Sequence, residues 1–231
     1  MRTVEQIENI KSRISIPYVI NNFLSNSDIQ HLITIFQKNN TKLYKNTGPI
    51  TLNIDTYLTD PIFIKIFDQI REHIGPFKMT AGFFFATDSP HIIHNDDTFE
   101  LPDQVYKGIT IPLMIDGSDR YPYLCFFDQF YFHGPAKFFK GSSDIPGHYN
   151  KHLYSYENID YLSTDPIDND SIEKYFTHLK PEWLEGLSLH SSLPWIPTTA
   201  IVFDSTRLHC ASDFRKLKIN SKLAISIFTK Y

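Results

Sequence analysis

Cysteine is scarce in this chain of 231 residues, which contains only Cys125 and Cys210. Two cysteines are too few for the disulfide framework of a small secreted domain and fit a reducing compartment. Long apolar runs are missing too, since no stretch approaches the roughly 20 residues that a bilayer-spanning helix needs. The polar start MRTVEQIENIKSR also lacks the apolar segment of a signal peptide. We therefore expect a soluble, cytoplasmic protein without a membrane partner.

An excess of positive charge is also absent. The formal net charge is −4, so no overall basic field attracts nucleic acid or an anionic membrane surface, and we expect neither as a partner. No internal repeat and no low-complexity linker divides the sequence, and all-β domains often reach this length as one unit. The sequence therefore predicts a single domain over residues 1–231.

Aromatic residues, by contrast, are abundant, with 19 Phe and 13 Tyr in an aromatic share of 15%. Aromatic and β-branched residues suit a pleated, half-buried surface, so these residues and the Ile-rich runs favour strands. Gly, Pro, Asp and Ser clusters separate the apolar runs. The pattern predicts six strands, at 77–87, 91–96, 107–115, 122–132, 198–204 and 222–230.

A helical flank is predicted ahead of these strands, over about residues 1–76, with a strand-like stretch at 14–25. Helices are expected at 3–13, 27–36, 60–74 and 171–179. Residues from about 137 to 190 show little periodicity and read as an inserted loop, a kind of segment that often forms lids or binding sites. Helices packed on many strands predict a mostly β fold with flanking helices, a jelly roll or a related double sheet.

Two histidines and two aspartates stand among isoleucines in PHIIHNDD, residues 90–97. In a strand, side chains alternate, so His94 and Asp96 share one face while His91 and Asp97 share the other. An imidazole and a carboxylate two residues apart can hold one metal ion, and a third ligand must then come from elsewhere in the chain. Two His and one carboxylate on one side of a metal form the arrangement of non-haem Fe(II) oxygenases. Asp97 is expected to be a supporting acid or a turn residue.

The candidate third ligand is His209, in TAIVFDSTRLHCASDF near the C-terminus. The final predicted strand, SKLAISIFTK, places Lys222, Ala224 and Ser226 on one face. A buried lysine needs an acidic partner, and its small neighbours leave room for a partner that is not a side chain. A dicarboxylate ligand satisfies both conditions.

In this order, the HxD motif, the distant His and the basic residue that begins the final strand resemble the Fe(II)- and 2-oxoglutarate-dependent dioxygenase superfamily. The fold of that superfamily is the double-stranded β-helix, a jelly-roll or cupin-like fold. PYVINNFLSNSDIQHLITIF is similar to the opening of its prolyl-4-hydroxylase-like members. IHNDD, YKGITIPL and FDSTRLHCASDF resemble oxygenases of marine bacteria and their phages. The resemblance covers most of the chain except roughly 137–190.

The resemblance implies that His94, Asp96 and His209 are the iron ligands of the catalytic centre. It implies that Lys222 pairs with the distal carboxylate of 2-oxoglutarate. Ser226 is the nearest hydroxyl on the same face and is a second candidate for that carboxylate, because this chain has Ala where some members have Ser. Many members use Arg in place of this lysine, and Arg215 competes as the anchor. We prefer Lys222 because it begins a strand.

The implied activity is that of a dioxygenase that uses Fe(II), O2 and 2-oxoglutarate to hydroxylate a small-molecule or peptide substrate, producing succinate and CO2. A cupin-type isomerase or lyase with the same metal ligands is an alternative that does not need Lys222. A non-catalytic jelly-roll binding module is a second alternative. Arg207, in TRLHC, either binds an acidic substrate or reaches solvent, and His190 either lines a substrate opening or belongs to a loop.

Overall fold

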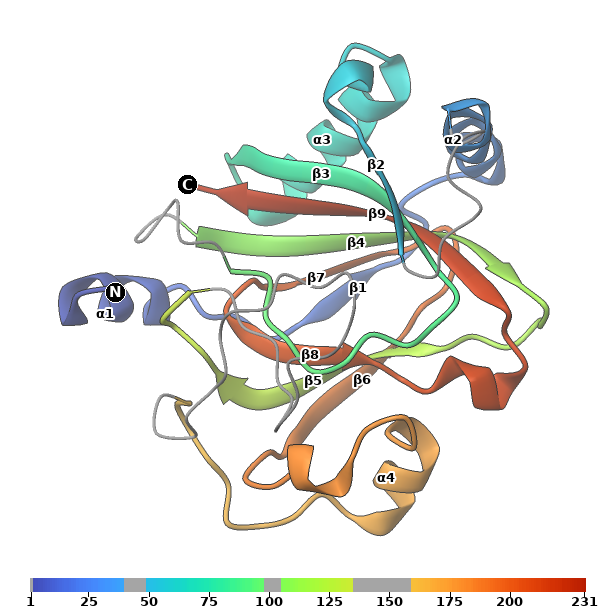
Figure 1. Cartoon of the computed structure of the whole chain (residues 1–231). Helices are drawn as coiled ribbons and strands as arrows, with labels where there is room; N and C mark the ends of the chain where they lie inside the picture. Colours follow the sequence, from blue (N-terminus) through green and yellow to red (C-terminus); the bar gives the residue numbers. More distant parts are fainter. Residues whose placement is uncertain (1, 40–48, 98–104, 135–158) are drawn as a thin grey trace.

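The structure is a computed structural model that describes residues 2–39, 49–97, 105–134 and 159–231. Its strands are β1 (Tyr18–Ile20), β2 (Ile50–Asn53), β3 (Lys78–Thr87), β4 (Val105–Asp116), β5 (Tyr123–Phe130), β6 (Leu189–Pro194), β7 (Ala200–Asp204), β8 (Arg207–Ala211) and β9 (Ser221–Lys230). They form a larger sheet in the order β1-β7-β4-β9-β3-β2 and a smaller one in the order β6-β5-β8. All these neighbours pair antiparallel, and the two sheets face each other (Figure 1).

The helices flank the two sheets. They are α1 (Val4–Lys11), α2 (Asn26–Asn39), α3 (Pro61–Ile74) and α4 (Asn169–Tyr175), with 3-10 turns η1 (Asp55–Tyr57), η3 (Pro181–Trp183) and η4 (Phe214–Leu217). The start of α3 follows from its sequence. The Asp60 side chain accepts from the backbone N–H of Ile62, and the proline at the first helical position loses no hydrogen bond there.

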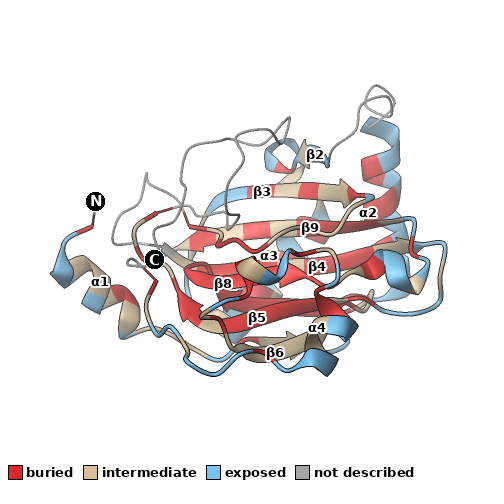
Figure 2. Cartoon of the chain, turned by 60° about the horizontal axis from the view of Figure 1, so that its bottom comes forward, coloured by how far each residue is buried: buried red, intermediate tan, exposed pale blue. Residues whose placement is uncertain are grey.

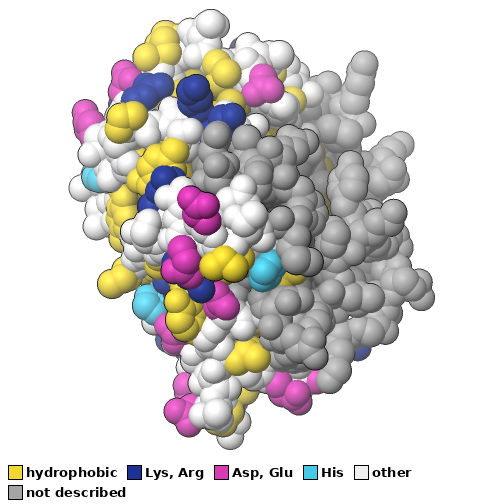
Figure 3. All heavy atoms as spheres, turned by 90° about the vertical axis from the view of Figure 1, so that its left-hand side faces the viewer, with side chains coloured by type: hydrophobic (Ala, Val, Ile, Leu, Met, Phe, Trp, Pro, Cys, Tyr) yellow, Lys and Arg dark blue, Asp and Glu magenta, His cyan; other side chains and the backbone are white. Residues whose placement is uncertain are grey.

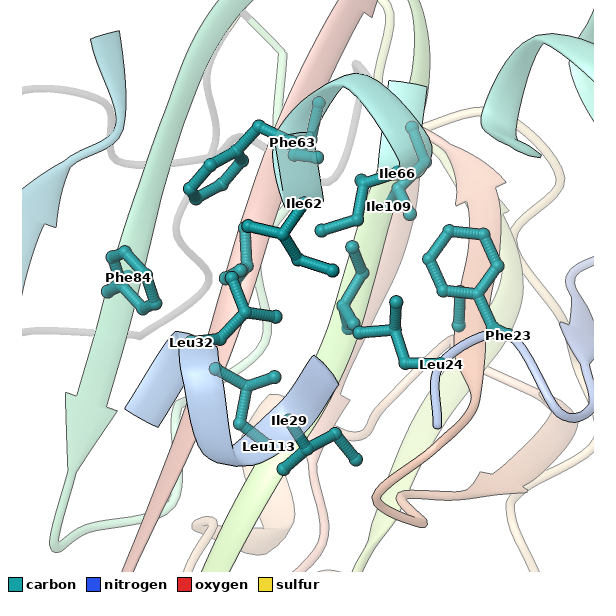
Figure 4. Close-up of a cluster of buried hydrophobic side chains, with 14 of the residues drawn as sticks. Phe23, Leu24, Ile29, Leu32, Ile62, Phe63, Ile66, Phe84, Ile109 and Leu113 are labelled. Atoms are coloured by element: carbon teal, nitrogen blue, oxygen red, sulfur yellow. The ribbon is translucent and has the colours of Figure 1, made fainter. Parts of the chain in front are cut away.

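The main apolar core lies between α2, α3 and the outer face of the larger sheet (Figure 4). Both helices place isoleucine, leucine and phenylalanine at helical spacing toward the sheet. On the facing side of β9, Leu223, Ile225 and Ile227 are almost completely buried. Because side chains alternate along a strand, Lys222 and Ala224 of β9 point to the other side, into the space between the two sheets.

Two smaller clusters complete the packing. One joins α4 to the outer face of the smaller sheet, through Phe176 of the segment after α4 and Phe127 and Leu208 of the sheet. The other lies between the sheets and contains Phe126 and Phe203. Colouring by burial shows the buried positions concentrated along the central strands of both sheets (Figure 2).

The space between the sheets has two distinct ends. At one end β7 finishes beside the start of β4, with Asp204 opposite Lys107, and β8 begins at Arg207. At the other end β9 begins beside the end of β4, with Lys222 opposite Ile115. We call these the Arg207 end and the Lys222 end. In Figure 1 the Arg207 end is on the left.

The structure confirms the mostly β fold with flanking helices. The bounds of α1, α2 and α3 lie within three residues of the predicted ones, whereas α4 begins two residues earlier and ends four residues earlier than predicted. The predicted strand 14–25 is reduced to β1, and 91–96 is a strand only at a single bridge residue, His94. Strands β2, β6 and β8 were not predicted. Of the predicted inserted loop, residues 137–158 lie outside the described residues, and the rest contains α4, η3 and the start of β6. No helix in the described parts of the chain is long and apolar enough to cross a membrane.

Candidate metal centre

The segment that carries HxD runs along the free edge of β8. The backbone N–H of His94 donates to the carbonyl of His209 at 2.9 Å, and the N–H of His209 donates back at 2.8 Å. Two residues further on, the N–H of Asp96 donates to the carbonyl of Ser205 at 2.8 Å. Backbone pairing therefore brings together side chains that are more than 110 residues apart in the sequence.

The three predicted metal ligands form one cluster. Asp96 Oδ1 lies 3.5 Å from His94 Nε2, and Asp96 Oδ2 lies 3.3 Å from His209 Nε2. One ligand atom from each residue lies within 4.8 Å of the other two. Atoms bound to one ion at about 2.1 Å are about 3–4 Å apart. The donor set therefore fits a single divalent ion after small adjustments.

Each histidine of the cluster is held by a backbone carbonyl. Nδ1–H of His94 donates to the carbonyl of Ile92 at 2.7 Å, and Nδ1–H of His209 donates to the carbonyl of Arg207 at 3.0 Å. A carbonyl can only accept, so the proton of each neutral ring lies on Nδ1. The Nε2 lone pairs therefore face Asp96, which is the tautomer that a metal site requires.

The surroundings of the cluster keep His94 neutral. Burial lowers the pKa of His94 well below its usual value, and the neighbouring rings of His209 and His91 lower it further against the opposing effect of Asp96. A neutral imidazole can bind a metal without first losing a proton. The surroundings therefore hold His94 in the neutral form that can act as a metal ligand.

Two aromatic rings pack against the ring of His209. Its ring centroid lies 4.6 Å from that of Phe203 and 5.8 Å from that of Phe126. Gly108 of β4 makes this arrangement possible, because a Cβ at that position would stand 2.7 Å from the Phe203 ring. The sequence analysis did not identify Gly108, although a glycine inside a strand often marks such a close approach.

His91 lies beside the cluster, which corrects the expectation that it faces away. Its Nδ1 is 3.3 Å from His94 Nε2, and the two ring centroids are 4.2 Å apart. The expectation was wrong because it assumed a regular strand over 91–96. The chain is irregular before His94, so alternation does not hold there.

Asp97 is turned away from the metal cluster, as predicted, and pairs with Arg2. The guanidinium binds both carboxylate oxygens, with Nη2 to Oδ1 at 2.7 Å, and Nη1 also donates to the carbonyl of Phe132 at 2.7 Å. Both side chains are buried. This pair ties the start of the chain to the residue that follows Asp96, a contact across 95 positions that no local pattern reveals.

Lys222 is buried between aromatic rings. Its Nζ lies 5.0 Å from the ring centroid of Trp195 and 5.2 Å from that of Phe214. It forms no hydrogen bond or ion pair with any residue that the structure describes. Burial lowers the pKa of Lys222 to about 8; the opposing effects come from the thiols of Cys125 and Cys210.

Lys222 lies on the face of β9 that is turned toward the smaller sheet, the sheet that carries His209. Ala224, on the same face of β9, packs with Phe126 and Phe203, which contact the ring of His209. The rival cation, Arg215, is exposed in η4, where its Nε donates to the carbonyl of Asp88 at 3.3 Å. Lys222 is therefore a buried cation and Arg215 an exposed one.

Ser226 lies further along the same face of β9, opposite Phe83 and Thr110 in the sheet. His190, predicted either in a loop or at an opening, lies in β6, and its Nδ1–H donates to Asp128 at 2.7 Å. Arg207 is buried rather than exposed. The alternative in which it reaches solvent is therefore excluded.

No protein-family model matches the sequence, and no curated protein matches it. Solved structures match over nearly the whole chain. HygX from Streptomyces hygroscopicus, with nickel and 2-oxoglutarate bound, is 11% identical with a TM-score of 0.52, over 99% of this chain and 86% of that one. The 2-oxoglutarate-dependent epimerase SnoN from nogalamycin biosynthesis is also 11% identical with a TM-score of 0.51, over 98% and 83%.

A third match is the 2-oxoglutarate-dependent carbocyclase SnoK from nogalamycin biosynthesis, 10% identical with a TM-score of 0.52, over 99% of this chain and 84% of that one. At 10–11% identity, the similarity to these structures shows the fold alone. The chain has the jelly-roll fold of these structures, which confirms the predicted fold. The narrower likeness to prolyl-4-hydroxylases stays a prediction.

Proposed function

We propose that the protein is an Fe(II)- and 2-oxoglutarate-dependent dioxygenase that hydroxylates a small-molecule or peptide substrate. Two features support the proposal: three converging ligand atoms at His94, Asp96 and His209, and a buried lysine, Lys222, that has no hydrogen-bond or ion-pair partner among the described residues. A metal site alone fits many proteins. The buried lysine adds a requirement for an anion, and a keto-dicarboxylate meets both requirements.

Iron would be held by Nε2 of His94, Nε2 of His209 and the carboxylate of Asp96. Two imidazoles and one carboxylate on one side of an ion leave the remaining positions open, which suits Fe(II) in oxygenases. The carbonyls of Ile92 and Arg207 fix the two rings, so the ligands need little reorganisation when the metal binds.

Lys222 would hold the distal carboxylate of 2-oxoglutarate. Removing an ammonium group from water without an anion is costly, so a bound carboxylate both neutralises the charge and fixes the orientation of the cosubstrate. Trp195 and Phe214 exclude water from this contact, which strengthens it. Ser226 remains a proposed second contact, and a weaker one, because four residues of strand separate it from Lys222 by about 13 Å.

When bound, iron and 2-oxoglutarate supply the oxidation: with O2, 2-oxoglutarate becomes succinate and CO2, one oxygen atom enters succinate, and the other converts a substrate C–H into C–OH. The side chains of this chain orient and shield that chemistry. Phe126 and Phe203 pack against His209 and keep its side of the site dry. Because Nδ1–H of each neutral ring donates to a backbone carbonyl, Nε2 carries the lone pair that a metal ion needs.

The two alternatives make different demands on the same residues. A cupin-type isomerase or lyase needs the metal ligands but leaves Lys222 without a role. A non-catalytic binding module needs no turnover at all. The matches to an epimerase and a carbocyclase also indicate that one fold hosts several oxidative outcomes, so hydroxylation is the part of the proposal that depends on product analysis.

The test is turnover of 2-oxoglutarate. The protein is loaded anaerobically with Fe(II) and 2-oxoglutarate and exposed to air, and succinate and CO2 are quantified with and without candidate substrates. We expect succinate and CO2 in equal amounts, with loss in Asp96→Ala and in Lys222→Ala and partial retention in Lys222→Arg. Succinate formation that is unaffected by Lys222→Ala contradicts Lys222 as the anchor of 2-oxoglutarate. No succinate under any condition contradicts the proposed function and leaves the isomerase or lyase and the binding module as the two candidates.

A further inference from the structure

Arg207 is a buried cation that the proposed chemistry does not use. Its side chain belongs to a residue that is 4% exposed. Nη1 donates to the carbonyl of Phe127 at 2.8 Å, and the guanidinium carbon lies 4.2 Å from the ring centroid of Phe130. Nε is buried and has no hydrogen-bond partner among the residues that the structure describes. One carbonyl and one ring leave most of the five N–H donors of a guanidinium unmatched.

The carboxylates closest to Arg207 are bound to other groups. Asp204 and Asp128 both act on it electrostatically. Asp204 forms a buried ion pair with Lys107, however, and Asp128 accepts a hydrogen bond from His190. No ion pair joins Arg207 to a carboxylate within the described residues. Because arginine stays charged, its burial needs an anion to offset the loss of hydration.

Arg207 lies on the same strand as His209, one of the three residues of the metal cluster. Arg207 lies two residues before His209 in β8, so the two side chains share one face of the strand, whereas Leu208 packs on the opposite face. Its own carbonyl accepts from Nδ1 of His209. Lys222 and Arg207 lie toward opposite ends of the space between the sheets.

The Arg207 end is also the end where β5 finishes and β8 begins. Figure 3 views the molecule from this side and shows positive and negative side chains mixed over its described part. Within that described part, no large area carries charge of one sign.

We propose that Arg207 binds an oxyanion group, a carboxylate or a phosphate, of the substrate and so orients it beside the metal. This inference rests on the proposed function, which assigns Lys222 to the cosubstrate. It narrows the substrate class to small molecules or peptides that carry an anionic group a few bonds from the oxidised carbon. The planar fork of arginine suits such two-oxygen groups better than an ammonium does.

The experiment uses sulfate as the probe and the full-length protein saturated with Ni(II) and 2-oxoglutarate, so that the metal and Lys222 are occupied. Sulfate affinity is measured by calorimetry at constant ionic strength, with chloride as the balancing salt. We expect Arg207→Gln to weaken sulfate binding at least tenfold and Arg207→Lys to weaken it less. Arg71→Gln is the matched control, because Arg71 is an exposed cation that pairs with Asp68, and it should leave sulfate affinity unchanged.

The inference is wrong if the unaltered protein binds no sulfate or if Arg207→Gln binds it with equal affinity. It is also wrong if a crystal structure shows a carboxylate of the protein itself bound to the Arg207 guanidinium. Affinities for Ni(II) and 2-oxoglutarate are measured on the same variants. If Arg207→Gln loses 2-oxoglutarate instead of sulfate, Arg207 is the cosubstrate anchor and the substrate assignment is wrong. If the protein binds sulfate through Arg207 but never binds 2-oxoglutarate, the anion site stands and the proposed function fails. Should Arg207→Gln not fold, Arg207→Lys and the crystal structure decide.

Discussion

The two faces of β9 differ in how well the neighbouring residues satisfy their side chains. The outward face presents Leu223 and Ile225 to α2 and α3, where both belong to the main apolar core. The inward face presents Lys222, Ala224 and Ser226 to the space that also holds the metal ligands, and the lysine has no partner among the described residues. One set of alternate residues in β9 thus stabilises the fold, and the other set presents a lysine that can bind an anionic ligand.

This difference separates stability from function at the level of single residues. Apolar burial on the outward face contributes free energy roughly in proportion to the area removed from water. An unpaired buried ammonium on the inward face costs free energy until a ligand binds. Substitutions on the outward face should therefore lower the free energy of unfolding and leave ligand affinity unchanged. Substitutions on the inward face should lower ligand affinity without lowering the free energy of unfolding.

The largest effect is expected from His209→Ala. Removing one of three ligands leaves too few donors for tight binding, so Ni(II) or Fe(II) affinity should fall by more than about 100-fold. Calorimetric titration of the metal measures this loss. Unchanged affinity would show that the metal binds elsewhere. Asn53→Ala, on β2 at the edge of the larger sheet, is the control that should leave metal affinity as it is.

Ile225→Ala tests the outward face. The side chain is fully buried, so its truncation should lower the free energy of unfolding by about 3 kcal/mol. Urea denaturation of the metal-free protein measures the change. Metal and 2-oxoglutarate affinities, taken below the unfolding transition, should stay within about twofold. A loss of metal affinity as large as that of His209→Ala would contradict the separation of the two faces.

Lys222→Met should lower the affinity for 2-oxoglutarate and raise the free energy of unfolding. The affinity for 2-oxoglutarate should fall at least 30-fold, because the distal carboxylate loses its cation. At pH 7 the free energy of unfolding should rise by about 1–3 kcal/mol, because folding depresses the pKa of Lys222 from 10.5 to about 8 and therefore disfavours the charged form. That gain is complete below about pH 8 and shrinks as the pH rises toward 10.5. Destabilisation at pH 7 would instead mean that Lys222 has a structural partner.

The pH dependence of 2-oxoglutarate binding isolates the same residue. Lys222 is charged below about pH 8 in the free protein and loses its proton above it, so binding at higher pH must recover a proton. The dissociation constant should be flat below pH 8 and rise up to about tenfold per pH unit above it. Lys222→Arg keeps its charge and should abolish the rise. The same rise in that variant would assign the titration to another group.

Ser226→Ala should have the smallest effect. Because Ser226 is about 13 Å along the strand from Lys222, we expect 2-oxoglutarate affinity to change by no more than about threefold. Isothermal titration with 2-oxoglutarate in the Ni(II) protein measures it. A change as large as that of Lys222→Met would make Ser226 a main contact rather than a secondary one.

Much of the inward chemistry could be predicted because it follows from alternation along strands. The HxD spacing placed His94 and Asp96 on one side, and the final apolar run placed Lys222 on the face opposite Leu223. The strands β6 and β8 escaped prediction because LHSSLP and RLHCA mix polar and apolar residues without a clear period. Their pairing with β5 is what makes strands of them.

Contacts between distant segments could not be predicted at all. Nothing local in the sequence connects Arg2 with Asp97 or shows that Arg207 is buried. The expectation for His91 failed for a related reason: backbone hydrogen bonds to β8 hold the chain at His94, while the residues before it follow no strand geometry. Alternation gives correct faces only where a strand is regular.

The most direct test of the account is an anaerobic titration of the protein with Fe(II) and 2-oxoglutarate, followed by visible absorption spectroscopy. The account predicts a weak charge-transfer band that appears only when both are present, saturates at one equivalent of each, and is absent in His209→Ala. A band of equal strength in His209→Ala, or no band in the unaltered protein at saturating concentrations, would contradict the claim that His94, Asp96 and His209 hold iron beside a bound keto-dicarboxylate.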